Sequence, residues 1–431
     1  MTEGPMSGRS RRDFLKIAVA GAAGTALAPS LGRAADKSVT LLHESSFIKT
    51  FDEYMQKTLA PAYEKETGVK VVYELTSVGS LPTRISTITE TGSGADVTMI
   101  FLLYPFLFAD KLMDVSDIAE DIGKKQGGWY DAAKEAGIVN GQWKSIPHSN
   151  IGQLMNWRTD WFKEVGVTKF PDTWEELYEV GKKLKAKDHP FGFELGHGFG
   201  DNHGWIYPLL WSYGGREVEP DGKTVVIDSD ETARAVDFAR KFFKDTMLDD
   251  VLGWTDVSNN KAWFAEQISC TNNAESILWL AKRDFPDIAK VTDQAMNPQG
   301  PKGRFHLLNC IGHSVFNFSP QKQEAHDFLH WVMEEKQLGG WYASADTYYQ
   351  PFLHAYDNAP MWDVEPRNKP YRDAMGSAHL PGWPAPPTRQ LAEVVAKYVT
   401  VDMFAKACAG ASTKEVIKNA EAQLKEIYRT A

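Results

Sequence analysis

Residues 94–103 read Gly94-Ala95-Asp96-Val97-Thr98-Met99-Ile100-Phe101-Leu102-Leu103, and the segment is almost entirely apolar from Val97 onward. A continuous apolar run of this length is typical of a strand buried on both faces of a helix-covered parallel sheet. Upstream, residues 39–43 form a short β run, and residues 69–75 alternate in the manner of a half-buried strand. The N-terminal part of the chain therefore contains three predicted strands.

Two helical segments separate these strands. Apolar residues recur at helical spacing from Phe51 to Tyr63, and Gly68 follows at the place of a left-handed C-terminal cap. A second helical segment over residues 83–91 ends before Gly92. The order strand, helix, strand, helix, strand predicts an α/β fold with a parallel sheet and right-handed crossovers.

The same alternation continues further along the chain. Three capping-box spacings mark helix starts: Thr173 with Glu176, Asp228 with Glu231, and Ser412 with Glu415. Residues 416–428 predict a closing amphipathic helix. A chain of this length exceeds what one hydrophobic core usually covers, so we expect two lobes.

The N-terminus carries an export signal. Ser10-Arg11-Arg12-Asp13-Phe14-Leu15-Lys16 is typical of a twin-arginine leader, and a weakly apolar run over residues 17–28 follows it. This run is too short to span a bilayer core of about 30 Å. Small residues at 32–35 offer a cleavage site, without a cysteine that could carry a lipid. We therefore expect residues 1–35 to be a signal peptide for the twin-arginine (Tat) export machinery, and the mature chain to be unanchored in the periplasm.

Net charge excludes several partners. The whole chain has 47 basic and 57 acidic residues and a net charge of −10. Removal of residues 1–35 takes away five basic and two acidic residues, which leaves 42 and 55 and a net charge of −13. Such an acidic chain does not suit nucleic acid, whose phosphates require clustered Lys and Arg. It does not suit an anionic membrane surface either.

The three cysteines, Cys270, Cys310 and Cys408, are widely spaced and odd in number, which excludes a disulfide scaffold. Twin-arginine export carries proteins folded in a reducing cytoplasm, so we expect free buried thiols. A single bridge between Cys270 and Cys310 remains the alternative.

Further markers support a resemblance to a known family. In chain order they are Gly94-Ala95-Asp96-Val97, Asn140-Gly141-Gln142-Trp143-Lys144-Ser145-Ile146-Pro147, Leu154-Met155-Asn156-Trp157, Phe170-Pro171-Asp172-Thr173-Trp174-Glu175-Glu176-Leu177, Trp211-Ser212-Tyr213-Gly214-Gly215, the helix start at Asp228-Ser229, and Asn297-Pro298-Gln299-Gly300-Pro301. With these segments the chain resembles the extracellular solute-binding proteins of ABC importers, a group that includes maltose-binding and other sugar-binding receptors.

The resemblance implies a two-lobe periplasmic binding protein fold of type II, with three hinge crossings and a ligand cleft between the lobes. It also implies a membrane permease as the partner, which recognises the closed form. We expect the mature chain to be a monomer. On this basis we assign residues 36–148 and 304–344 to lobe 1, and residues 149–303 and 345–431 to lobe 2.

A sugar site needs aromatic platforms and hydrogen-bonding side chains, and ligands of such folds bind beyond the carboxyl ends of strands. Strand ends and family positions together give these candidate ligand-binding residues: Glu44, Ser45, Tyr104, Asn150, Asn202, Trp205, Asn273, Glu275, Tyr348 and Trp383. Core packing is the alternative for Tyr104, and a hinge hydrogen bond is the alternative for Asn150. Glu275 stands where many relatives present a stacking tryptophan, and a carboxylate there favours hydroxyl binding or capture of a cation.

We therefore expect a receptor for a sugar or related polyol. The alternatives are a receptor for a charged solute, such as a polyamine or glycerol phosphate, and an exported enzyme. The chain has no C-x-x-C, H-E-x-x-H or G-x-S-x-G motif and no dinucleotide fingerprint, so we expect no catalytic residue and no cofactor. His189, His197 and His203 lack fixed partner ligands in the sequence, so we expect no metal there.

Overall fold

The structure is a computed structural model, and it describes residues 37–198 and 200–429. The predicted leader, residues 1–35, lies outside the described residues. The chain from Lys37 onward forms one compact unit. None of the helices in the described ranges is long and apolar enough to cross a membrane.

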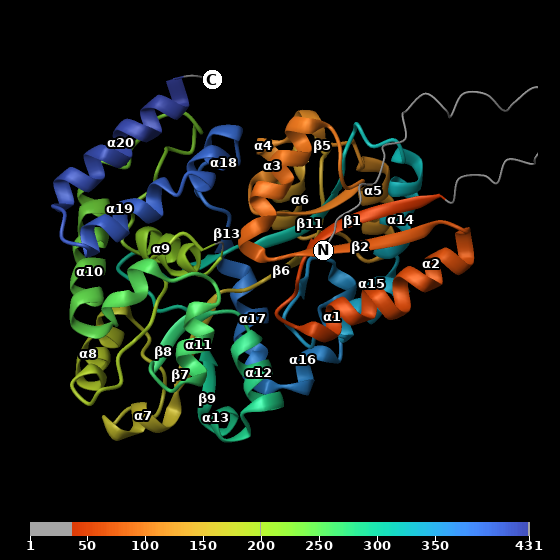
Figure 1. The fold of residues 1–431 in the computed structure, drawn as a ribbon. Coiled ribbons are helices and arrows are strands. Elements are labelled where there is room, and N and C mark those ends of the chain that lie inside the picture. Colours follow the sequence, from red (N-terminus) through yellow and green to blue (C-terminus); the bar gives the residue numbers. More distant parts are fainter. Residues whose placement is uncertain (1–36, 199, 430–431) are drawn as a thin grey trace, which may run out of the picture. The chain divides into compact units, whose positions relative to one another are not determined.

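A six-stranded mixed sheet organises the first core (Figure 1). Its strands, in spatial order, are β12 (Gln350–Pro351), β6 (Ile146–Asn150), β11 (Cys310–Val315), β3 (Val97–Phe101), β1 (Ser38–Glu44) and β2 (Lys70–Thr76). β1 is parallel to both β2 and β3, as the sequence predicts. β11 is antiparallel to β3 and to β6, so the prediction of a parallel sheet holds for only part of it.

The helices between the first strands also follow the prediction. α1 (Lys49–Tyr54), the π-helical turn η1 (Met55–Leu59) and α2 (Ala60–Thr67) run without a break, and Gly68 ends them at a φ of 72°. α3 (Leu81–Thr91) ends at Gly92 with a φ of 64°. Glycine suits both positions because a side chain would clash in this left-handed conformation.

The remaining elements around the first core include short turns and longer helices. They are η2 (Val78–Ser80), α4 (Tyr104–Leu107), η3 (Ala109–Lys111), α5 (Ser116–Lys125), α6 (Asp131–Gly137), β4 (Ile138–Val139), β5 (Gln142–Trp143), α14 (Lys322–Met333), α15 (Glu335–Ala343) and η5 (His354–Tyr356). α14 contacts β1, β11 and α5, so it belongs to the same core as the six-stranded sheet.

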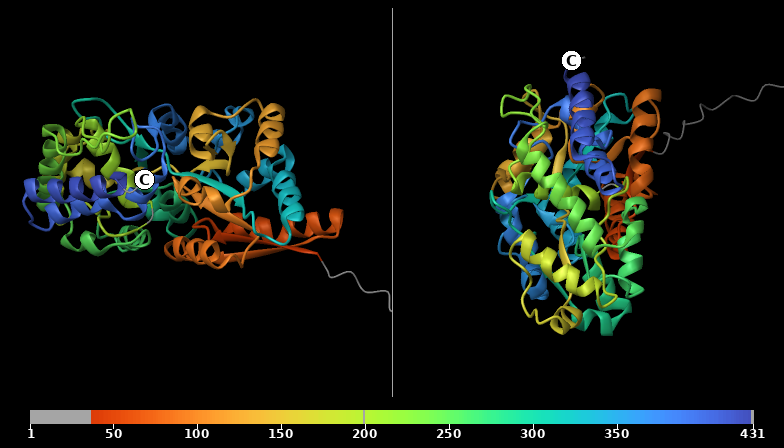
Figure 2. Two further views of the ribbon diagram at one scale, coloured as in Figure 1. Left: turned by 90° about the horizontal axis from the view of Figure 1, so that it is seen from above. Right: turned by 90° about the vertical axis from the view of Figure 1, so that its left-hand side faces the viewer.

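The second core surrounds a three-stranded sheet in the order β8 (Cys270–Asn273), β7 (Leu154–Arg158) and β9 (Thr292–Ala295). Both outer strands are antiparallel to β7, so the expectation of a parallel sheet is wrong here. The helices of this core are α7 (Thr159–Glu164), α8 (Trp174–Lys185), α9 (Asp201–Ser212), α10 (Asp230–Thr246), α11 (Ser258–Phe264), α12 (Ser276–Asp284), α13 (Pro286–Val291), α19 (Val399–Cys408) and α20 (Thr413–Arg429). α19 and α20 pack against α10, and in Figure 2 these blue helices lie beside the green segment.

The predicted helix caps are largely present. Thr173 and Glu176 form the complete capping box of α8. The Ser412 hydroxyl accepts the Glu415 N–H at 3.3 Å. The predicted start at Asp228 is wrong by one residue, because Ser229 is the N-cap of α10 and accepts from the Thr232 N–H.

The chain passes between the two cores three times, near residues 151–154, near residues 296–308, and between Tyr356 and α19. The last passage consists of short elements: α16 (Met361–Val364), η6 (Pro366–Asn368), α17 (Lys369–Ala374), η7 (Met375–Ser377), β13 (Ala378–His379) and α18 (Arg389–Ala396). β13 pairs with β10 (His306–Leu307) of the second passage. In the second core, the short turn η4 (Asp249–Gly253) precedes α11. β12 and Tyr356 still pack with the first core. The predicted lobe boundary after residue 344 therefore comes too early.

Candidate functional site

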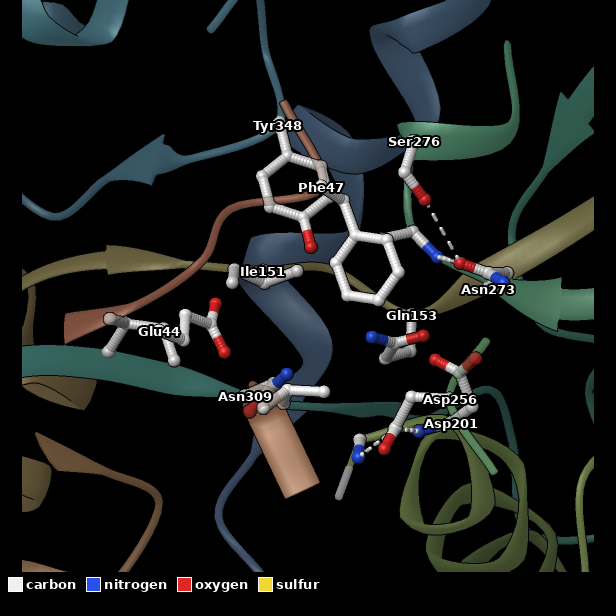
Figure 3. A pocket seen from close by; sticks show the side chains of 14 residues that line it. Glu44, Phe47, Ile151, Gln153, Asp201, Asp256, Asn273, Ser276, Asn309 and Tyr348 are labelled. Carbon is white, nitrogen blue, oxygen red and sulfur yellow. Dashed lines mark hydrogen bonds between the residues drawn. The ribbon is translucent and has the colours of Figure 1, made fainter. Parts of the chain in front are cut away.

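A cavity lies between side chains of both cores (Figure 3). It contains about 400 Å³ of space, including the part open to solvent. Its wall consists of Glu44, Phe47, Val78, Ile151, Gln153, Gly200, Asp201, Asp256, Asn273, Ala274, Ser276, Asn309, Ile311 and Tyr348. Three of these residues are acidic and none is Lys, Arg or His.

The first core contributes Glu44, Phe47 and Tyr348 to this wall. Glu44 is the last residue of β1, so its side chain lies at the carboxyl end of the strand, and it is only 3% exposed. Burial raises the pKa of Glu44 to about 8, and the charges of Asp256 and Asp52 add to the effect. In Figure 3 the Glu44 carboxyl group, the Phe47 ring and the Tyr348 hydroxyl all point toward the cavity.

The second core contributes two carboxylates. Asp201 is the first residue of α9, and its Oδ2 accepts a hydrogen bond from Asn259 Nδ2 at 2.6 Å. Asp256 Oδ1 accepts the Gly200 N–H at 2.8 Å. Burial, together with the charge of Asp256, raises the pKa of Asp201 well above its usual value. The two side chains are therefore buried acids in the cavity wall, and the charge of Asp256 disfavours ionisation of Asp201.

Glu194 lies behind these two acids. One oxygen atom of each of Glu194, Asp201 and Asp256 lies within 4.8 Å of the others. Glu194 Oε1 accepts the Gly198 N–H at 2.7 Å, and a side chain at Gly198 would collide with this carboxylate. Glycine at this position thus allows the loop to close around Glu194.

Three amide side chains complete the polar lining. Asn273 is held by its neighbours, since its Nδ2 donates to Asn260 Oδ1 at 2.7 Å and its Oδ1 accepts the Ala274 N–H at 2.6 Å. Gln153 Oε1 and Asn309 Oδ1 are buried and have no hydrogen-bond partner among the described residues. A buried acceptor without a partner is costly, so these two oxygens are suited to accept from a hydroxyl or ammonium group.

Three of the predicted ligand-binding residues, Glu44, Asn273 and Tyr348, lie in this wall. Ser45, next to Glu44, is not in the wall, and its N–H donates to the Thr76 carbonyl. The other predicted residues also lie outside this wall: Tyr104, Asn150, Asn202, Trp205, Glu275 and Trp383.

Asn150 is the last residue of β6, just before the first passage between the cores. Its Nδ2 donates to Gln350 Oε1 at 3.1 Å, and the Gly152 N–H donates to the same oxygen at 2.7 Å. Gln350 Nε2 in turn donates to the carbonyl oxygens of Thr347 and Tyr348. The Gln350 side chain therefore joins the first passage between the cores to the segment that carries Tyr348.

The Asn202, Trp205 and Tyr104 side chains pack inside the protein. Asn202 Nδ2 donates to the carbonyl oxygens of Gly196 and Gly198, so it shapes its own loop. Trp205 is completely buried in the second core, and Tyr104 packs against aromatic rings at the end of β3. Their predicted role as ligand contacts is not supported by these positions.

Glu275 and Trp383 are also absent from the cavity wall. Glu275 is completely buried, accepts from Asn368 Nδ2 at 3.2 Å, and has a pKa raised well above its usual value by burial. Trp383 packs with its ring 4.4 Å from that of His379 and 6.0 Å from that of Trp211. Neither residue meets the expectation of a ligand platform in this cavity.

Sequence reasoning missed Phe47, Gln153, Asp201, Asp256 and Asn309. Asp201 is adjacent to the predicted Asn202, Gln153 lies in the first passage between the cores, and Asn309 directly follows the second. Polar residues at a crossing were thus the available signal for both amides. Asp256 lies in a loop without periodicity, and no sequence signal pointed to it.

The cysteines and loop histidines have other environments. Cys270, Cys310 and Cys408 are buried and free, and Cys270 and Cys310 lie in different sheets. His189 stacks on Trp161 at 4.1 Å, while His197 Nε2 lies 2.6 Å from Asp402 Oδ1. The structure therefore does not bring these histidines together as a ligand set.

Comparison with known structures identifies the fold. The maltose-bound protein of T. maritima is 20% identical with a TM-score of 0.78, and the match covers 90% of this chain and 99% of that one. A solute-binding protein of Thermotoga lettingae, bound with α-D-tagatose, is 16% identical with a TM-score of 0.80, and covers 91% and 100% of the two chains. A third, from Agrobacterium radiobacter K84 in complex with ribitol, is 16% identical with a TM-score of 0.75 over 91% and 98%. The fold is thus that of two-lobe periplasmic binding proteins of type II.

Sequence comparison agrees with this fold. A probable ABC transporter-binding protein of Deinococcus radiodurans is 25% identical over 293 residues, which cover 65% of this chain and 69% of that protein. The family model described as bacterial extracellular solute-binding protein matches residues 44–338. The chain is a member of the bacterial extracellular solute-binding protein family.

Proposed function

We propose that the chain is the substrate-binding component of an ABC importer and that it binds a sugar or related polyol in the cavity between its two cores. The observation that carries the proposal is the wall of this cavity, where carboxylates and amides of both cores surround a space next to Phe47 and Tyr348. Carboxylate and amide oxygens accept hydrogen bonds from hydroxyls, and aromatic rings pack on the C–H faces of a sugar.

The ligands of structurally similar proteins favour a small solute. Structurally similar proteins bind tagatose and ribitol, which are small, as well as maltose. A monosaccharide or a short polyol is therefore our first choice.

A cationic solute such as a polyamine is the second candidate. Glu44, Asp201 and Asp256 line the cavity, and no Lys, Arg or His lines it to balance their charge. An ammonium group would supply that balance through charge-assisted hydrogen bonds. The same wall disfavours glycerol phosphate, because a phosphate needs basic partners.

The proposal includes the location of the protein in the cell. The twin-arginine leader supports export of the folded chain by the Tat machinery to the periplasm, where a monomer without a lipid anchor delivers its ligand to the permease. The protein performs no chemistry on the ligand in this proposal. The alternative of an exported enzyme would require measured turnover of the bound solute.

A thermal-melting screen tests the proposal. The purified chain is melted in the presence of monosaccharides, disaccharides, pentitols, polyamines and glycerol phosphates, since a ligand of the folded state raises the melting temperature by mass action. The Asn309→Ala variant serves as a matched control, because it removes one open acceptor of the wall. We expect a sugar or polyol to stabilise the wild type more than the variant. A shift with polyamines alone would favour the second candidate and contradict the first.

A further inference from the structure

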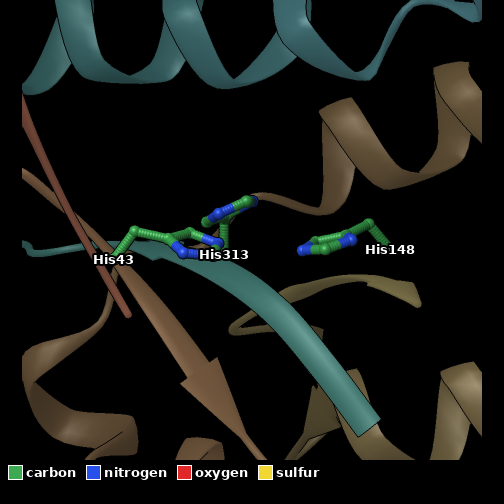
Figure 4. Close-up of side chains that lie close together, drawn as sticks. All are labelled: His43, His148 and His313. Atoms are coloured by element: carbon green, nitrogen blue, oxygen red, sulfur yellow. The ribbon is translucent and has the colours of Figure 1, made fainter. Parts of the chain in front are cut away.

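Three histidines gather inside the first core, at some distance in sequence from one another. His43 belongs to β1, His148 to β6 and His313 to β11. One ring nitrogen of each lies within 4.8 Å of those of the other two, and all three side chains are at most 1% exposed. Figure 4 shows the rings close together, with a nitrogen atom of His148 facing the other two rings.

The nitrogens of this cluster lack partners. His43 Nε2, His148 Nε2 and both ring nitrogens of His313 are buried without a hydrogen bond to any described residue. A buried polar atom without a partner loses its hydrogen bonds to water and gains none in the protein, which destabilises the fold. Four such atoms lie in one small region, so the cluster lowers the stability of the fold unless a further group binds to them.

The other nitrogens orient the rings for coordination. His43 Nδ1 lies 2.8 Å from the Glu44 carbonyl oxygen, which can only accept, so this nitrogen carries the proton and Nε2 keeps its lone pair. His148 Nδ1 lies 2.8 Å from Ser149 Oγ. A hydrogen bond at Nδ1 and an open Nε2 is the usual arrangement of a metal-binding histidine.

The surroundings exclude water. The Trp341 ring of α15 is stacked on His313 with centroids 5.8 Å apart, and the Phe51 ring lies 6.0 Å from His43. Tyr73 lies 5.6 Å from His43 and its hydroxyl donates to Asp52 Oδ1 at 3.0 Å. Aromatic rings therefore enclose the three imidazoles.

We propose that His43, His148 and His313 bind a late first-row divalent metal ion, with Zn²⁺ the best match, and so tie three strands of the first sheet together. Imidazole nitrogen is a preferred ligand of Zn²⁺, at about 2.0–2.1 Å. Three such bonds would satisfy three of the four open nitrogens. Because the cluster is enclosed, the ion would enter before folding is complete.

The test measures metal content in the purified full chain after exhaustive dialysis against a chelator at neutral pH. The wild type is expected to retain about one Zn²⁺ per chain, and His43→Gln and His313→Gln to retain less than one tenth of that amount. His330→Gln is the control, because His330 belongs to a partly exposed group with Asp121 and Glu334 that could also bind metal. Metal retained by the wild type but lost in His330→Gln would overturn the proposal.

A second measurement does not depend on the variants folding. The wild type is refolded from denaturant with a chelator, with Zn²⁺ or with Co²⁺. We expect Zn²⁺ to raise the melting temperature by about 2 °C or more relative to the chelator, and bound Co²⁺ to show the visible absorption of a nitrogen-coordinated ion. No retained metal, no shift with Zn²⁺ and no Co²⁺ spectrum would show that the histidines form a metal-free core.

Discussion

Replacement of Trp205 tests whether this residue contacts the ligand or packs in the core, because the loss of stability can be worked out from the structure. The side chain is completely buried, its ring lies 5.7 Å from that of Phe193 in an edge-on arrangement, and Nε1 donates to the Glu194 carbonyl at 2.7 Å. Truncation of a buried tryptophan to alanine costs about 3–5 kcal/mol. The orphaned Glu194 carbonyl adds about 1–3 kcal/mol if water does not reach it.

We therefore expect Trp205→Ala to lower the free energy of unfolding by about 4–8 kcal/mol, a large part of the roughly 5–15 kcal/mol that stabilises a typical domain. Trp205→Phe keeps most of the apolar volume and loses the hydrogen bond, so its expected cost is about 1–3 kcal/mol. Equilibrium urea unfolding, followed by circular dichroism, measures both values.

Affinity separates the two roles of this residue. In Trp205→Phe, the affinity for whichever solute stabilises the wild type is expected to stay within about threefold, whereas Asn309→Ala loses about tenfold. If Trp205→Phe unfolds at the same urea concentration as the wild type but binds ten times more weakly, the assignment of Trp205 to the core is wrong.

Three further substitutions test the wall, the hinge and the sheet. The pKa of Asp201 is raised on folding, so the unfolded chain releases this proton first and stability falls as the pH rises above the usual value of 3.8. Asp201→Asn avoids that loss, so its melting temperature should exceed the wild-type value increasingly from about pH 4 to about pH 7, and an equal pH dependence would contradict this reasoning. Gln350→Leu leaves two buried N–H donors without their acceptor and should cost about 2–4 kcal/mol in urea unfolding; a cost under about 0.5 kcal/mol would argue against the hinge bonds. In Gly312→Ala the new Cβ would lie 2.5 Å from Ser145 Oγ and 2.8 Å from the Ile146 carbonyl oxygen. We expect this overpacking to cost about 1–3 kcal/mol, and an unchanged melting temperature would show that β11 and β6 can separate there.

The first half of the first sheet could be predicted because its signals are local. The alternation in β2, the apolar run of β3 and the glycines that end α2 and α3 each act within a few residues. The position of β11 between β3 and β6 depends on pairing between segments far apart in the sequence. Periodicity carries no information on such pairing, so the antiparallel part of the sheet could not be predicted from it.

The candidate site shows the same limit at the level of single residues. Glu44 could be placed because it ends a strand that the sequence marks clearly. Every residue of α9 is buried, so burial does not distinguish the residues that line the cavity from those that pack in the second core. Successive residues of a helix point about 100° apart. Asn202, the predicted contact, therefore points away from the cavity, whereas its neighbour Asp201 lines it.

The most direct test of the account is native mass spectrometry of the freshly purified chain, with release and identification of any bound small molecule. We predict one neutral sugar or polyol per chain, bound in the wild type and largely lost in Asn309→Ala. A polyamine in its place, or a chain that carries no solute and takes up none of the sugars and polyols of the melting screen, would contradict the proposed function.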